Sequence, residues 1–259
     1  MVSGTCLSLG LPIEAGRQPI ATQRSPAQHF MARDGGDYAA DLPERPGFGF
    51  ADDYLLIACH GTTHIDALSH IWREGLMWNG FSKDTVTSRG AARCGIEKVG
   101  PLVTRGLVLD LVPEGHVGLD PGHEITVDEL IAATRRSGVQ PEPGDALLLR
   151  TGWLARWREK TADASSWPGI GADSAEWLGE QGFAIVGADN LAVEASPSSD
   201  PSCAAPLHVK AMRDRGIYLM ELLDLEQLVQ QGRHTFLLIV APLAIAGGVG
   251  SPVAPVAVI

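Results

Sequence analysis

The sequence predicts a single α/β domain. Its 259 residues are 45% hydrophobic and 20% charged, which is typical of a folded globular chain. Short apolar runs that suit buried strands alternate with segments that suit helices, and no linker separates two cores. We therefore expect one domain that spans residues 1–259.

An N-terminal arm is the first feature along the chain. Residues 14–52 are rich in Gly, Pro, Asp and Arg and show no periodicity. A stretch of this length without a pattern often has a function, such as lining a site or exchanging with a partner. We expect an arm at about residues 14–52, followed by a buried strand over the apolar run 54–59.

The remaining elements follow from apolar runs and capping signals. Thr126 and Glu129 form a capping box, which begins a helix that ends at about Ser137. We expect two further helices over 173–181 and 223–230. Apolar runs predict four more buried strands, over 106–112, 145–150, 183–186 and 234–240.

Charge and composition exclude several classes of partner. The chain has 20 Lys plus Arg against 31 Asp plus Glu, a net charge of −11, and no basic block or stripe, so nucleic acid and anionic membranes are excluded. The longest apolar run, 236–250, is broken by proline and glycine and is too short to span a bilayer. Four scattered cysteines and the absence of a signal-peptide pattern lead us to expect a cytoplasmic protein with reduced cysteines. We expect a small-molecule substrate and a homodimer or homotetramer.

A cluster of metal-binding residue types occupies residues 60–70. The pattern His-x3-His-x-Asp-x3-His contains three of the eight histidines, and imidazoles beside a carboxylate suit a divalent metal. On one continuous strand, His60 and His64 would lie about 13 Å apart, too far to share an ion. On a helix, Asp66 would point away from both histidines. The chain must therefore turn between the histidines, at residues 61–63.

Distant partners are needed to complete a metal site. His208 begins a stretch that ends at Gly216, and the strand-like residues 217–220 then lead to Glu221. If the two segments run antiparallel, His208 and Glu221 finish at the same end of the unit. Taken alone, Glu221 is equally consistent with a solvated strand end. Beside the histidine cluster, the pair becomes a candidate set of ligands.

These motifs resemble the cyclase family of metal-dependent hydrolases, which includes bacterial kynurenine formamidases and isatin hydrolases. The family pattern is HxGTHxDxPxH, from which this sequence departs at Thr62, in place of glycine, and at Leu68, in place of proline. Neither position is a ligand. Further parts of the resemblance are the His208 to Leu225 segment and the short motifs at 79–81, 150–153, 186–189 and 247–252.

The resemblance implies both a fold and a metal centre. The fold would be a mixed, partly barrel-like sheet flanked by helices, of the swivelling β/β/α type. His60, His64 and Asp66 would bind one ion, Asp66 with His208 would bind a second, and Glu221 would reach both. The nitrogen and oxygen ligands allow one or two divalent ions, with zinc expected and manganese as the alternative.

The expected activity is hydrolysis. By the resemblance, His70 would be the proton donor and acceptor. Trp72 and Trp78 follow the histidine cluster directly in the sequence, and we expect them to line the substrate pocket. We expect a hydrolase that opens a cyclic amide, a lactone or an N-acyl (formamide-type) bond of a small, ring-containing substrate. A lyase or cyclase that uses the same metal is the alternative, and a non-catalytic metal-binding protein is the third hypothesis. The sequence has no GxSxG motif, which argues against an α/β-hydrolase.

Overall fold

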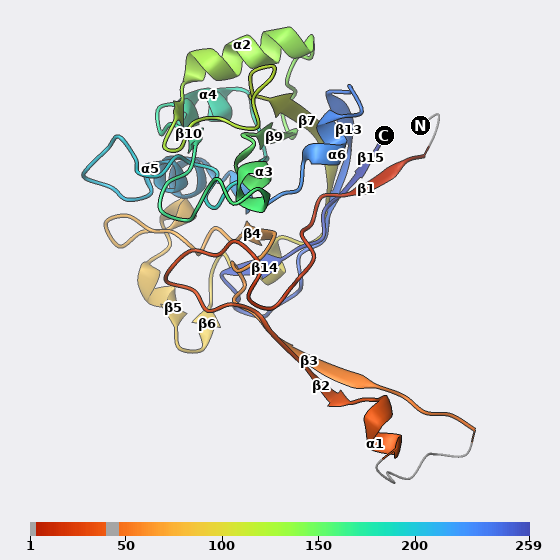
Figure 1. The fold of residues 1–259 in the computed structure, drawn as a ribbon. Coiled ribbons are helices and arrows are strands. Elements are labelled where there is room, and N and C mark those ends of the chain that lie inside the picture. The colour runs from red at the N-terminus through yellow and green to blue at the C-terminus, as the bar shows by residue number, and fades with distance from the viewer. Residues whose placement is uncertain (1–3, 40–46) are drawn as a thin grey trace.

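A nine-stranded mixed sheet forms the centre of the protein, and the computed structural model describes residues 4–39 and 47–259. The sheet curls into a half-barrel (Figure 1). The four middle strands, β7, β9, β11 and β12, run parallel, and the strands on either side pair antiparallel. In spatial order the strands are β1 (Cys6–Ser8), β15 (Val256–Val258), β13 (Thr235–Val240), β7 (Leu102–Asp110), β9 (Ala146–Arg150), β11 (Ile185–Ala188), β12 (Tyr218–Glu221), β4 (His64–Asp66) and β14 (Gly250–Pro252).

Helices and loops cover both faces of the sheet, and α2 and α4 lie together in Figure 1. Leu107 and Leu147 point to the core that α2, α4 and η4 cover, whereas Val108 and Leu148 point to the core that α6 covers. Both faces are buried, so the central strands appear in the sequence as continuous apolar runs. The helices are α2 (Val127–Ser137), α3 (Trp153–Arg158), α4 (Ser174–Glu180), α5 (Pro206–His208), the π-helical η4 (Val209–Arg213) and α6 (Glu226–Val229).

The predicted fold class is confirmed, and several elements lie where the sequence placed them. The capping box is present, because Thr126 accepts a hydrogen bond from the Glu129 backbone while the Glu129 side chain accepts one from the Thr126 backbone. Helix α2 ends at Gly138, whose φ of 68° is left-handed. The helix predicted over 223–230 is shorter and begins at Glu226, because the backbone of Leu223 and Asp224 donates hydrogen bonds to Ala188 and Leu9 instead.

The arm contains regular structure that the sequence did not predict. Strands β2 (Gln28–Arg33) and β3 (Asp52–Leu56) form a two-stranded ribbon with α1 (Gly35–Ala39) between them, and the ribbon extends away from the body (Figure 1). Residues 40–46 of the predicted arm lie outside the described residues. The predicted buried strand 54–59 is wrong in its burial: Tyr54 and Leu56 are each 63% exposed. Within the described residues, β3 pairs with no strand other than β2, and the apolar side chains of the ribbon remain exposed.

Short elements complete the described chain. Three turns of 3₁₀-helix and two small sheets lie in the connections. They are η1 (Trp78–Gly80), η2 (Lys83–Thr85), η3 (Ile96–Lys98), the antiparallel pair β5 (Val86–Thr87) and β6 (Gly90–Ala91), and the parallel pair β8 (Glu124–Ile125) and β10 (Gly169–Ile170). Across residues 4–39 and 47–259, no helix is long and apolar enough to cross a membrane. All four cysteines are free thiols.

Candidate metal centre and active site

Two neighbouring strands at one side of the sheet carry most of the metal-ligand candidates. Glu221 at the end of β12 lies opposite His64 of β4, and Asp66 follows two residues along β4 on the same face. His60 lies in a tight turn, in which the Gly61 backbone donates a 2.8 Å hydrogen bond to Ala58, and the chain then bends at residues 61–63 before β4 begins. The turn between the histidines is therefore present where the strand geometry required it.

The structure brings all five predicted ligands together, and each is buried. Oδ1 of Asp66 lies 3.1 Å from Nε2 of His60 and 3.4 Å from Nε2 of His64, and Oε2 of Glu221 lies 3.2 Å from the same His64 nitrogen. Nε2 of His208 lies 3.6 Å from Oδ2 of Asp66 and 3.3 Å from Oε1 of Glu221. Two three-residue groups result, and Asp66 belongs to both.

The donor atoms of this cluster fit a divalent metal. Nε2 of His60 and His64, both carboxylate oxygens of Asp66 and Oε2 of Glu221 are buried without a hydrogen-bond partner. An unsatisfied buried polar group costs about 1–3 kcal/mol, so five of them need a partner. Tetrahedral ligands around zinc lie about 3.3 Å from one another, and the spacings observed here are 3.1–3.6 Å.

The negative charges of the cluster also favour a bound cation. Burial alone would lower the pKa of His64, but the charges of Glu221 and Asp66 raise it to about 10. Burial alone would raise the pKa of Glu221, but His64 holds it at about 2. The two carboxylates therefore attract either protons on the imidazoles or a cation in their place, and metal binding displaces those protons.

Hydrogen bonds fix the orientation of the His64 ring and of the turn before it. Nδ1 of His64 lies 2.7 Å from the Thr62 carbonyl, so this nitrogen donates and Nε2 keeps its lone pair for a metal. The Thr63 hydroxyl donates to the Leu222 carbonyl at 2.5 Å and accepts from the Leu11 backbone at 2.9 Å. The metal-binding turn is thus tied to two distant segments of the chain.

Glu194 is a site residue that the sequence reasoning missed. Its carboxylate accepts hydrogen bonds from the backbone of Leu207 at 2.9 Å and of His208 at 3.3 Å, and also from Nδ1 of His208. These contacts turn Nε2 of His208 toward Asp66 and Glu221. Glu194 lies in a segment without helix or strand periodicity. In the sequence, only its acidic side chain, upstream of His208, could have indicated a role.

The C-terminal glycine motif has a packing role beside the metal cluster. Gly250 of β14 pairs with Asp66 of β4. A Cβ at Gly250 would collide with Nε2 of His60. In the sequence, residues 247–252 were only one motif of the family resemblance, whereas the structure shows that a larger residue at position 250 would displace His60.

His70 lies beside the cluster without belonging to either three-residue group. Its ring stacks on that of His60, with centroids 4.2 Å apart and planes at 24°. Burial lowers the pKa of His70 to about 4, although the charge of Asp66 opposes this shift. The imidazole is therefore neutral at pH 7 and able to accept a proton.

A cavity of about 330 Å³ opens beside the metal cluster. Trp167 supplies an aromatic wall, held by a 2.9 Å hydrogen bond from its Nε1 to the Glu194 carbonyl. Most other wall residues are apolar or small. The cavity is lined by Ala21, Thr22, Gln23, Arg24, His70, Ile71, Ala164, Trp167, Leu191, Ala192, Glu194, Ala195, Ser196, Ala204, Ala205, His208 and Glu221.

The two tryptophans predicted to line the substrate pocket do not border this cavity. After His70 the chain leaves the metal cluster, and Trp72 is 46% exposed. Trp78 packs against the main core, where its ring lies over Gly216. The prediction is corrected to Trp167, which sequence proximity to the histidine cluster could not identify because it lies about a hundred residues away.

Asp189 joins two of the short motifs noted in the sequence. Its buried carboxylate accepts hydrogen bonds from the Thr151 backbone at 2.8 Å, the Thr151 hydroxyl at 2.6 Å and the Gly152 backbone at 2.8 Å. Gly152 has a φ of 76° and begins α3. Asp189 thus fixes the turn between β9 and α3 at the ends of adjacent strands.

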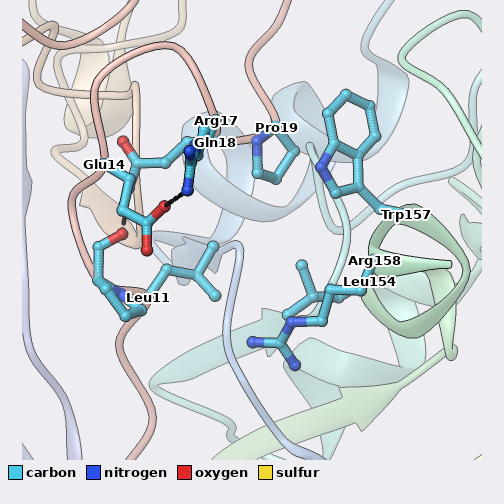
Figure 2. A pocket seen from close by; sticks show the side chains of 9 residues that line it. Leu11, Glu14, Arg17, Gln18, Pro19, Leu154, Trp157 and Arg158 are labelled. Carbon is cyan, nitrogen blue, oxygen red and sulfur yellow. Dashed lines mark hydrogen bonds and ion pairs between the residues drawn. The ribbon is translucent and has the colours of Figure 1, made fainter. Parts of the chain in front are cut away.

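A second cavity, of about 250 Å³, lies between the N-terminal loop and α3. Figure 2 shows its wall, in which Trp157 and Leu154 face the loop that carries Arg17, and Arg17 pairs with Glu14 at 3.6 Å. Gln18 of this loop donates to the Thr62 hydroxyl at 2.9 Å. None of the predicted site residues borders this cavity, so the candidate active site is the larger one.

Comparison with known proteins places the chain in a family. The Cyclase family model matches residues 7–195, well over half of the sequence. The chain belongs to the cyclase family. The resemblance seen in the sequence is therefore confirmed.

One curated protein and several solved structures are also similar to this chain. Isatin hydrolase of Roseibium aggregatum is 26% identical over 216 residues, which cover 81% of this chain and 75% of that protein. The crystal structure of a novel cyclase matches with a TM-score of 0.90 and 36% identity, over 99% of this chain and 87% of the other. An isatin hydrolase bound to the product analogue thioisatinate matches with a TM-score of 0.73 at 22% identity, over 98% and 92% of the two chains, which shows a shared fold.

Proposed function

We propose that this protein is a metal-dependent hydrolase that opens a cyclic amide, a lactone or an N-acyl (formamide-type) bond of a small, ring-containing substrate. The observation that carries the proposal is a set of five buried ligands, four of them with unpartnered donor atoms, beside the cavity that His70 also lines. Kinship with isatin hydrolase of Roseibium aggregatum supports hydrolysis. The apolar wall and Trp167 support a substrate with a ring.

The metal ligands divide into two groups. His60, His64 and Asp66 would hold one ion, and Asp66, His208 and Glu221 would hold a second. A divalent ion in this cluster supplies Lewis-acid activation of water and of the substrate carbonyl. The mixed nitrogen and oxygen ligands suit zinc, our first choice, or manganese.

Residues around the ligands hold them in place and move protons. Thr62 and Glu194 orient the rings of His64 and His208. A ring nitrogen of neutral His70 takes a proton from the attacking water and returns it to the departing amine or alkoxide. Trp167 packs against the substrate ring and keeps bulk water from that side.

Hydrolysis in ¹⁸O-labelled water tests this proposal against its alternative. The metal-loaded protein is assayed on isatin, formanilide and simple lactones, and the product acids are analysed by mass spectrometry. We expect one solvent oxygen in each product acid. Turnover without incorporation favours the lyase or cyclase, and an intact metal site that turns over nothing favours a non-catalytic metal-binding protein.

We also propose that the protein is a homodimer or homotetramer in which the β2–β3 ribbon packs against a second copy. Phe30, Met31, Tyr54, Leu55 and Leu56 on this ribbon are 48–63% exposed. A second copy presents the same ribbon, so apolar faces and open strand edges match by two-fold symmetry. The four free cysteines support our further proposal of a cytoplasmic location.

A further inference from the structure

Arg24 stands out among the residues that line the active-site cavity. It comes from the loop that precedes the ribbon and is half-buried. Among the lining residues it is the only lysine or arginine. The carboxylates of the lining, Glu194 and Glu221, belong to the metal centre, whereas the wall formed by Trp167, Leu191 and the alanines is apolar. A cation beside an apolar wall is a feature that selects for an anionic ligand.

The guanidinium of Arg24 is anchored but not neutralised. Its Nη1 donates a 2.7 Å hydrogen bond to the backbone carbonyl of His60, so the charge is fixed beside a metal ligand. Within residues 4–39 and 47–259, no carboxylate forms an ion pair with Arg24, whereas Arg105, Arg150 and Arg158 each pair with at least one. A guanidinium has five N–H donors in a planar fork, and the remaining ones are available for a carboxylate.

The charge balance of the site permits an acid to bind there. The carboxylates of Asp66, Glu194 and Glu221 carry three formal negative charges. One divalent ion together with Arg24 carries three positive charges. With one ion bound and Arg24 absent, the site would keep one excess negative charge and would repel an incoming carboxylate at short range, where Coulomb energies are only weakly screened.

We propose that Arg24 binds a carboxylate of the substrate at the wall of the cavity. The inference rests on the proposed hydrolase function and names its substrate class: a small ring-bearing acid whose scissile carbonyl lies at the metal centre and whose separate carboxylate lies on Arg24. Trp167 and Leu191 contact the ring between these two points. Arg24 is thus a specificity-determining residue.

Binding of benzenedicarboxylates to the zinc-loaded protein tests this inference without turnover. Benzoate has one carboxylate, which a metal alone can bind, whereas phthalate, isophthalate and terephthalate add a second in three positions. Isothermal titration calorimetry should show that at least one of the three binds wild type ten or more times more tightly than benzoate. Arg24→Gln should reduce this ratio to near one, and Arg24→Lys should keep part of it.

The ratio of dicarboxylate affinity to benzoate affinity distinguishes carboxylate binding by Arg24 from a purely structural role of Arg24. If Arg24 only fixed the His60 carbonyl, Arg24→Gln would weaken benzoate and the dicarboxylates equally and would lower the zinc content measured on the same samples. Arg17→Gln, which removes the same charge outside the cavity, should leave the ratio unchanged. Equal ratios in wild type and Arg24→Gln, or no gain from any second carboxylate, overturn the inference. The hydrolase proposal fails separately, if wild type turns over no amide, lactone or formamide whatever the calorimetry shows.

Discussion

Glu194 and His208 are joined through Nδ1 of the imidazole, on the side of the ring away from Asp66 and Glu221. Glu194 accepts two backbone hydrogen bonds as well, so its carboxylate orients both the ring and the first turn of α5. Through these hydrogen bonds, Glu194 determines the direction in which the Nε2 lone pair of His208 points.

Glu194→Gln should therefore weaken metal binding by about 10–100-fold, because the amide turns an N–H₂ group toward at least one of these donors. Competition with a chromogenic zinc chelator measures the affinity, and circular dichroism checks that the fold is kept. Glu176→Gln, an exposed change on α4, is the matched control. Unchanged affinity in Glu194→Gln would show that His208 is not a ligand or needs no orientation.

The shared position of Asp66 predicts how many ions each variant keeps. Elemental analysis should find one or two divalent ions per chain in wild type. If two are bound, Asp66→Ala should lose both, whereas His208→Ala should keep the ion held by His60 and His64. A wild-type protein that contains no zinc, manganese, cobalt or iron and is not activated by adding them would refute the metal site.

His64 and His70 should separate metal binding from proton transfer. His64→Ala removes a ligand and should lose metal and activity together. His70→Ala should retain the metal and lose about 10²–10⁴-fold in kcat, because only the proton transfer is removed. Metal analysis and kinetics on the same preparations test this division, which is wrong if His70→Ala releases metal as readily as His64→Ala does.

Asp189 should make stability depend on pH. Burial raises the pKa of this carboxyl from 3.8 to about 6, against the pull of its hydrogen bonds from Thr151 and Gly152. The folded chain then holds the proton at higher pH than the unfolded chain does, so the stabilisation is complete below about pH 3.8 and is lost as the pH rises to about 6. The loss is up to about 3 kcal/mol.

Urea unfolding of metal-free wild type and Asp189→Asn from pH 4 to pH 7 measures this effect. The variant shares every other titrating group, so the difference between the two free energies of unfolding isolates Asp189. We expect wild type to lose stability relative to Asp189→Asn across this range. A difference that stays constant with pH would show that the Asp189 pKa is not raised.

The exposed ribbon predicts self-association. Tyr54→Asp combined with Leu56→Asp places charges on its apolar surface and should convert a dimer or tetramer into monomers in analytical ultracentrifugation. Leu243→Asp changes an equally exposed apolar residue outside the ribbon and should leave the assembly intact. Wild type that sediments as a monomer at micromolar concentration would refute the proposal.

Local chemistry in the sequence determined several features of this protein. The capping box and the left-handed glycine fixed both ends of α2, because these signals act within one turn of helix. The buried central strands were visible as continuous apolar runs, because both of their faces are covered. The His60 to Asp66 spacing required a turn between the histidines, since ligands of one ion must lie within a few ångströms of each other.

Tertiary structure alone decided the rest. Glu194, Arg24 and Trp167 reach the site from loops without periodicity. Contacts between distant segments place them there: Glu194 with His208, Arg24 with the His60 carbonyl, and Trp167 with the Glu194 carbonyl. The apolar run 54–59 suggested a buried strand, yet β3 is exposed. Hydrophobic residues indicate that a surface can be buried, but they do not show which segment would cover it. Local sequence determines local backbone shape, whereas contacts between distant segments depend on how the whole sheet curls and on which loops its edges bring together.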